Sequence, residues 1–254
     1  MAYIFHNFFY QPIFNALIFF YNNLSFGDLG IAIILLTIFI RLVLFPLFYK
    51  SAKDQAIIQR LSPKIKEIQK THKDDKEKQT RALMELYKEH QVNPLSGFLL
   101  IFIQLPVLIA LYRVFLQNLT VDTMKDLYSF ISAPASINHF FLGFIDLKTT
   151  NLIIVILAAV SQYYQGKLAL PKNNNTNVKE LSATESMARQ MVYLGPVLTF
   201  VFLYFLKLPS AVGLYWLTTS LFSVIQQIII NKNISIKKEL NEEIKKEEQN
   251  GRTN

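Results

Sequence analysis

The chain has 254 residues, of which 52% are hydrophobic and 17% charged, with a formal net charge of +8 and a mean hydropathy of +0.27. Soluble domains carry about 25% charged residues, so the composition excludes an ordinary soluble domain, and 21 Phe with 12 Tyr exclude intrinsic disorder. The absence of Cys excludes disulfides, thiolate metal sites, a Cys nucleophile and lipid attachment through Cys. A pI of about 9.4 with this hydropathy favours a membrane protein with cationic cytoplasmic loops over a nucleic-acid binder.

Residues 1–28 are expected to form an extracytoplasmic, interfacial segment. The first basic residue is Arg41, so the basic region of a cleavable signal peptide is missing and the spans themselves would direct membrane insertion. Asn7, Gln11 and Asn15 recur at every fourth position with Asn22 on the same side, and apolar residues lie elsewhere. This pattern is typical of an amphipathic helix lying in the membrane interface. The alternative is a sixth span over residues 7–22.

Five apolar stretches follow, and a span needs about 20 mostly apolar residues to cross the hydrocarbon. No strand-like alternation, heptad or repeat is present, so helices are expected throughout. The stretches are approximately residues 29–49, 95–112, 152–168, 187–206 and 211–230. The expected fold is therefore an all-α polytopic membrane protein. Residues 29–49 form the first span, residues 94–230 hold the second to fifth spans with their loops, and residues 231–254 form a tail.

Residues 50–93 differ in composition, with 11 Lys or Arg and 7 Asp or Glu. Apolar residues at helical spacing lie on both sides of a polar turn at Thr71–Lys76. They are Ile58, Leu61, Ile65 and Ile68 before the turn, and Ala82, Leu83, Leu86 and Tyr87 after it. The pattern predicts a helical hairpin outside the bilayer, in which Pro63 kinks or restarts the first helix. Residues 120–150 read as a loop and residues 171–184 as a flexible connector.

The basic residues fall on one side of the predicted spans. The hairpin, the connector and the tail together hold 21 Lys or Arg, and the opposite side holds 4. The positive-inside bias therefore predicts a cytoplasmic hairpin and C-terminus and an N-terminus outside.

Arg41 is the most informative single residue. It lies about 12 residues into the first span, or ~18 Å, where a cation costs ~2.5–3.5 kcal/mol unless water or a partner reaches it. No Asp or Glu lies in the five stretches, so no fixed intramembrane counter-ion is available. We interpret Arg41 as a cation in a water-filled cavity; the alternative is a snorkelling or structurally paired Arg. Thr37 lies one turn away, and Pro46 frees a backbone carbonyl and favours a bend.

Polar residues in three other spans could line the same hydrated groove. The second span has Gln104, the third has Gln162 with Ser161 and Gln165, and the fifth has a stripe of polar residues at helical spacing. The candidate groove residues are Arg41, Thr37, Gln104, Gln162, Trp216, Thr219, Ser223 and Gln226. The alternative for each is a hydrogen bond that joins packed helices.

Motifs of enzymes are missing from the sequence. No G-x-x-x-x-G-K-[ST], H-E-x-x-H or G-x-S-x-G is found, and the four His lie outside the predicted spans without metal-like spacing. We therefore expect no enzyme activity, no catalytic residue, no cofactor and no metal.

Residues 27–115 contain Arg41 in the first span, followed by LSPKIK, YKEHQVNPL and QLPVLIALY, and residues 208–227 read LPSAVGLYWLTTSLFSVIQQ. By these motifs and their order the sequence resembles the YidC/Oxa/Alb family of membrane protein insertases. It implies five spans around a groove that opens to the cytoplasm and the lipid and is closed towards the outside. Arg41 matches the family's groove arginine, residues 50–93 match its mobile cytoplasmic hairpin, and the second and fourth spans match the slide along which a nascent span leaves.

The resemblance also implies the function and the partners. The protein would insert nascent membrane proteins into the bacterial plasma (inner) membrane and help them fold, with or without the Sec translocon. The large extracytoplasmic domain and additional N-terminal span of Gram-negative members are missing, as is the lipoprotein Cys of Gram-positive members. The tail has 6 basic and 5 acidic residues, which weakens electrostatic binding to a ribosome.

Two other functions compete with insertion. A small polytopic transporter or channel would more often show paired repeats or intramembrane carboxylates, and the sequence shows neither. A basic adaptor for ribosomes or RNA would carry a strongly cationic tail.

Overall fold

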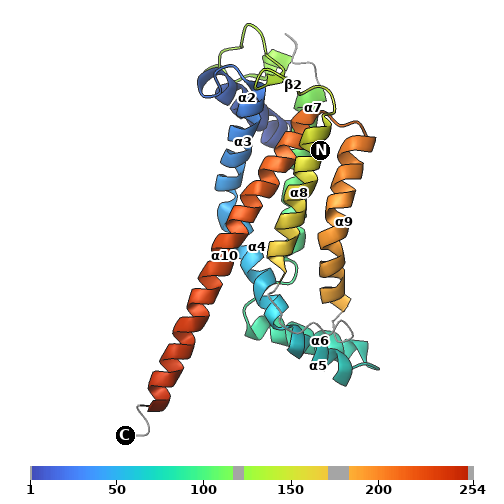
Figure 1. The fold of residues 1–254 in the computed structure, drawn as a ribbon, viewed down its shortest axis with the longest axis vertical. Coiled ribbons are helices and arrows are strands. Elements are labelled where there is room, and N and C mark those ends of the chain that lie inside the picture. The colour runs from blue at the N-terminus through green and yellow to red at the C-terminus, as the bar shows by residue number, and fades with distance from the viewer. Residues whose placement is uncertain (1, 117–122, 171–182, 251–254) are drawn as a thin grey trace.

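The computed structural model describes residues 2–116, 123–170 and 183–250. Most of the described chain is helical, and α3, α4, α7, α8, α9 and α10 run along the long axis of the molecule (Figure 1). The first half contains α1 (Ala2–Phe5), the π-helical η1 (His6–Tyr10), α2 (Gln11–Asn23), α3 (Leu29–Val43), α4 (Phe45–Arg60), α5 (Ser62–Thr71), α6 (Lys76–Glu89) and α7 (Ser96–Leu116). The second half contains the 3₁₀ turn η2 (Thr123–Asp126), β1 (Phe140–Phe141), β2 (Ile145–Asp146), α8 (Leu152–Ala169), α9 (Ala183–Phe205) and α10 (Ser210–Asn250).

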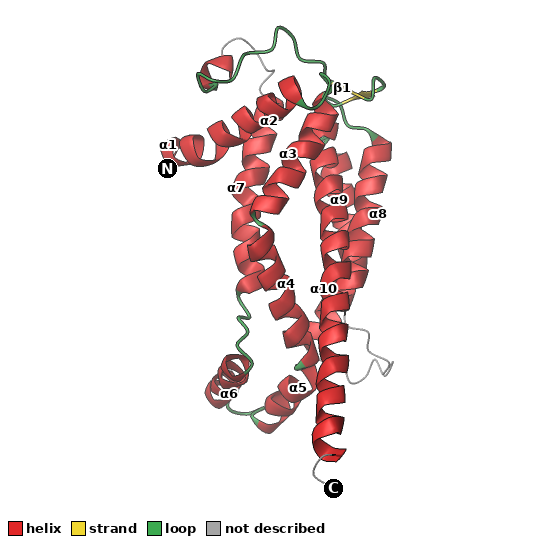
Figure 2. Cartoon of the chain, turned by 90° about the vertical axis from the view of Figure 1, so that its left-hand side faces the viewer, coloured by secondary structure: helices red, strands yellow, loops and turns green. Residues whose placement is uncertain are grey.

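The two ends of the bundle differ in what they carry. One end carries α2 and residues 123–150, and we call it the loop end; the other carries α5 and α6, and we call it the hairpin end (Figures 1 and 2). Helix α10 continues past the predicted end of its span at residue 230 and stays helical to Asn250. The predicted connector at residues 171–184 falls almost entirely outside the described residues.

Several helices of the described chain are suited to a bilayer. Helix α8 and the Ser210–Asn233 part of α10 are long and apolar enough to cross a membrane, and α3 with α4 becomes a third such span if the bent pair counts as one. Shorter apolar stretches occupy Phe102–Phe115 of α7 and Arg189–Phe205 of α9. Large apolar side chains are exposed on α7, α8, α9 and α10, where lipid would cover them.

The predicted first span is bent. Asp28 caps α3 because its Oδ1 accepts a hydrogen bond of 3.0 Å from the amide of Ile31. The helix is interrupted at Leu44, and α4 begins at Phe45 with Pro46 in its first turn, at 66° to α3. Proline removes a backbone donor and its ring clashes with the preceding turn, which accounts for the break. The predicted first span over 29–49 is therefore two helices joined at a bend, which Pro46 had indicated, and α4 continues past residue 49 to Arg60.

The largest apolar core joins α2, α3 and α7 near the loop end. Phe14, Leu17, Ile33, Leu36 and Leu111 are almost completely buried there. A second core lies where α8, α9 and α10 pack together.

Close packing of α8 against α10 depends on a glycine. A Cβ atom at Gly213 would lie 2.8 Å from Cγ2 of Ile154, so a larger residue would push the two helices apart.

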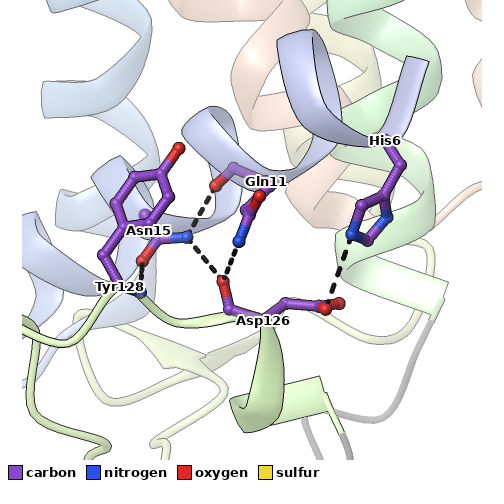
Figure 3. A network of polar contacts seen from close by, with 5 residues as sticks. All are labelled: His6, Gln11, Asn15, Asp126 and Tyr128. Carbon is purple, nitrogen blue, oxygen red and sulfur yellow. Dashed lines mark hydrogen bonds and ion pairs between the residues drawn. The ribbon is translucent and has the colours of Figure 1, made fainter. Parts of the chain in front are cut away.

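The polar face of the N-terminal helix points into the protein. Gln11 and Asn15 both donate hydrogen bonds to the carbonyl of Asp126, at 3.1 and 2.9 Å, and the Asn15 carbonyl accepts from the amide of Tyr128 at 2.7 Å (Figure 3). Asn22 donates to the carbonyl of Ser132 at 2.8 Å. The regular spacing of Asn and Gln in this helix therefore marks contacts with the backbone of the 123–150 loop.

Apolar side chains are exposed on the helical segment that precedes α2. Tyr3 and Ile4 of α1 and Phe8 of η1 are all exposed, with Phe8 at 73%. Helix α2 lies across the end of the bundle and does not run along it (Figure 2). Both features fit a helix that rests in the membrane interface.

The loop end contains one departure from the expected all-α fold. Strands β1 and β2 pair antiparallel, with Phe141 opposite Ile145. Leu142 and Gly143 have φ of 51° and 81° and turn the chain, and the amide of Leu142 donates to Oδ2 of Asp28 at 2.7 Å. The prediction of helices and loops alone was wrong here, because strands of two residues are too short to produce an alternating pattern.

Helices α5 and α6 form a small separate core. Leu61, Ile65, Leu86 and Val92 are buried there, and Ile57, Ile58, Ile68, Leu83 and Tyr87 pack around them. Pro63 lies in the first turn of α5, which restarts the helix after Leu61. The carboxylate of Asp75 caps α6 and accepts from the amide of Lys78 at 3.0 Å, which lowers the pKa of Asp75.

Candidate functional site

Arg41 lies in the last turn of α3 and is 6% exposed. Its guanidinium carbon lies 4.3 Å from the centroid of the Phe48 ring, which belongs to α4 beyond the bend. The bend therefore folds an aromatic face against the cation, an arrangement that stabilises it partly. No carboxylate within the described ranges forms an ion pair with Arg41. The charge is thus buried and not neutralised by this part of the protein.

Thr37 lies one turn before Arg41 and is also buried. Its hydroxyl donates a hydrogen bond of 2.6 Å to the carbonyl of Ile33 in the same helix. A hydroxyl used in this way adds a polar atom to the Arg41 face of α3 without projecting far from the helix.

Tyr215 of α10 is a site residue that the sequence analysis missed. It is buried, and the amide of Gln104 on α7 donates a hydrogen bond to its hydroxyl. It stands four residues before Thr219 and eleven before Gln226, so the three share a face of α10. Spacing from Thr219 could have found it, but the neighbouring Trp216 fits the predicted stripe equally well.

Trp216 and Gln162 contact each other, and this contact is separate from the one between Gln104 and Tyr215. The indole of Trp216 and the hydroxyl of Ser220 each donate to the Gln162 carbonyl at 3.2 Å, which joins α10 to α8. The Trp216 ring also lies 6.0 Å from the ring of Phe202 on α9. The predicted stripe of α10 is thus divided between two faces. The Trp216 face makes the kind of interhelical hydrogen bond that was the alternative for these residues.

The remaining two candidate residues also belong to α10. The hydroxyl of Ser223 donates to the carbonyl of Thr219 at 3.0 Å within the helix. Gln226 is 5% exposed, and its amide nitrogen has no hydrogen-bond partner.

Other buried polar side chains of the described residues also have atoms without a hydrogen-bond partner, among them the hydroxyls of Ser51 and Ser62 and Oδ2 of Asp54. Buried polar atoms in native proteins are nearly always paired, so each unpaired one needs an explanation, such as an ordered water or a bound ion. With Gln226, they lie on α4, on α10 and at the start of α5.

Comparison with known proteins gives a consistent result. A family model described as 60Kd inner membrane protein matches residues 19–239. Similar relatives named membrane protein insertase YidC occur in Francisella tularensis subsp. novicida (strain U112), subsp. holarctica (strain LVS) and subsp. tularensis (strain SCHU S4). Each is 36% identical over 207 residues, which is 82% of this chain and 33% of the relative, so the chain spans about a third of their length. By the extent of these matches, the chain belongs to the YidC/Oxa/Alb family of membrane proteins.

Proposed function

We propose that this protein is a membrane protein insertase and chaperone, and that α3, α4, α7 and α10 line a hydrated groove for the polar flank of a nascent span. The observation that carries the proposal is the buried, unneutralised charge of Arg41. Buried polar atoms without partners on the neighbouring α4 and α10 support it, because water in a groove would pair them. The names of the relatives support the same function.

The physics requires no nucleotide and no catalytic residue. A nascent apolar span gains ~0.3–0.6 kcal/mol per strongly apolar residue near the bilayer centre. The obstacle is the polar flank, which must cross a medium of low dielectric constant. A groove that ends part-way through the bilayer shortens that path, and Arg41 attracts acidic residues in the flank. The protein would lower a barrier without supplying the driving force.

The proposed topology has five spans. They are the bent pair α3–α4 and the apolar parts of α7, α8, α9 and α10, with the loop end outside and the hairpin end in the cytoplasm. The distribution of Lys and Arg supports this orientation. Nascent membrane proteins and the bilayer are the proposed partners, with the Sec translocon and the ribosome as further ones. A transporter or channel is not favoured by the family or by the relatives' names.

Reconstitution tests the proposed function. Proteoliposomes that contain the purified chain should protect the translocated flank of a short single-span client from added protease, and liposomes without the chain should not. The client's flank should carry two Asp residues, so that unassisted insertion is slow. Equal protection in both vesicle types would refute the proposal.

The orientation can be tested separately, because the chain has no Cys. Thr71 at the hairpin end and Ala135 at the loop end are both exposed. An impermeant maleimide added to intact cells should label an Ala135→Cys variant and not a Thr71→Cys variant, and both should react after lysis. The reverse pattern would show that the chain has the opposite orientation.

A further inference from the structure

Asp54 is a buried carboxylate that takes no part in the proposed attraction between Arg41 and the acidic flank of a client. It lies on α4, 13 residues after Arg41, and is 5% exposed. Its Oδ2 has no hydrogen-bond partner, and in the part of the chain that the structure describes no basic side chain pairs with it. A carboxylate out of water is unfavourable unless it is paired, so this site is incomplete without a partner.

The side chain belongs to the same face as Arg41. Phe48, Ser51 and Asp54 are the buried residues of α4, and a spacing of three places them along one side of the helix. Phe48 packs its ring on the Arg41 guanidinium, so this side continues the Arg41 face across the bend. Helix α4 packs against α7 and α10 and lies between them in Figure 2. The buried face of α4 therefore belongs to the proposed groove, nearer the hairpin end than Arg41.

Two other buried polar groups, on α4 and on α10, are also unpartnered. The Ser51 hydroxyl lies one turn before Asp54, and the Gln226 amide belongs to α10, which contacts α4. The neighbours Lys50 and Lys53 are exposed, away from the buried face. A carboxylate and a hydroxyl oxygen accept hydrogen bonds from an ammonium or guanidinium group, whereas the amide nitrogen of Gln226 is a donor that suits a carboxylate.

We propose that Asp54, assisted by Ser51, binds a Lys or Arg side chain in the trailing flank of a nascent span. The inference rests on the proposed function. Inserted spans keep their basic residues on the cytoplasmic side, and the hairpin end is the proposed cytoplasmic end. Arg41 attracts the acidic leading flank and Asp54 holds the basic trailing flank. The two charges have opposite signs and lie 13 residues apart on the bent span. Together they favour the orientation in which the client's acidic flank leads and its basic flank trails.

The test uses the reconstituted full chain and two clients that differ only in the trailing flank, with three Lys or with three Gln. Asp54→Asn keeps the shape and removes the charge. We expect it to slow insertion of the Lys client about fivefold, the scale of one modest ion pair, and to leave the Gln client unchanged. Asp146→Asn, a partly exposed carboxylate on β2 at the loop end, is the matched control and should affect neither, because Asn keeps the oxygen that accepts from the amide of Lys148. Asp54→Lys should go further, with the Lys client inserted still more slowly and a client with three Glu inserted faster than by the unsubstituted chain.

The outcomes separate the two proposals. Equal slowing of both clients by Asp54→Asn, or no slowing of either, would overturn the Asp54 site while insertion by the unsubstituted chain upholds the function. Failure of the unsubstituted chain to insert any client would overturn both. Thermal unfolding in detergent, measured for each variant, shows whether a loss of rate comes from a loss of folded protein.

Discussion

Replacing Arg41 by Ala should slow insertion of clients with acidic leading flanks at least about tenfold, and replacing it by Lys should keep most of the activity. A positive charge at this depth attracts the carboxylates that must cross, and the attraction is strong where the surroundings are poorer in water than the solvent. Because no bidentate carboxylate partner of the guanidinium is present among the described residues, an ammonium can take its place. Insertion rates in proteoliposomes at equal protein content measure the effect.

The control for this prediction is a second Arg in the same kind of contact. Arg113 on α7 lies with its guanidinium carbon 4.9 Å from the centroid of the Phe5 ring, at the loop end. Arg113→Ala removes a cation from an aromatic face but leaves the proposed groove intact, so it should have little effect on rate. Clients whose leading flank carries Asn in place of Asp should be almost insensitive to Arg41→Ala. Equal losses for Asp and Asn clients would show that Arg41 is structural.

Local sequence rules predicted most of the elements. Runs of apolar residues located α7, α8, α9 and the first part of α10 within a few residues. Helical spacing found the residues that pack between α5 and α6. Arg41 could be singled out because a charge in an apolar run is costly wherever its side chain points, and that argument needs no tertiary structure.

Features that depend on packing could not be predicted in this way. Asn15 looks like a residue of a solvated face, yet it is buried, because the carbonyl of Asp126 and the amide of Tyr128 take the place of water. Tyr215 and Trp216 are neighbours that face different helices, and only the positions of α7 and α8 decide which one contacts Gln104. Spacing in a single helix fixes relative angles, and the neighbouring helices determine what each face contacts.

The burial of Asp54 could not be predicted from the sequence pattern either. The sequence analysis assigned it to the hairpin at residues 50–93, because the first span was expected to end near residue 49. The bend at Leu44 starts a new helix that carries Asp54 against α7 and α10. A proline in an apolar run indicates that a bend is possible, but its angle and the burial that follows from it are tertiary properties.

The second large effect is expected from the hairpin end. A variant in which a flexible Gly–Ser linker replaces residues 62–90 should remain folded and embedded in the membrane but insert clients about tenfold more slowly. The reason is that α5 and α6 share a core of their own and connect to the bundle mainly through α4, so the apolar cores of the spans lose no partner. Detergent unfolding and insertion rates, measured on the same preparations, give the two quantities.

A point variant tests whether insertion requires a folded hairpin or only the presence of its residues. Leu86 is buried in the small core, and Leu86→Ala should cost ~2–5 kcal/mol of local stability, enough to loosen α6 from α5. Met84 lies on the same helix and is exposed, so Met84→Ala is the matched control. If the hairpin receives clients as a folded unit, Leu86→Ala should lower the insertion rate towards that of the deletion and Met84→Ala should not. A deletion variant that inserts clients at the full rate would show that the hairpin is dispensable and that the groove alone captures its substrates.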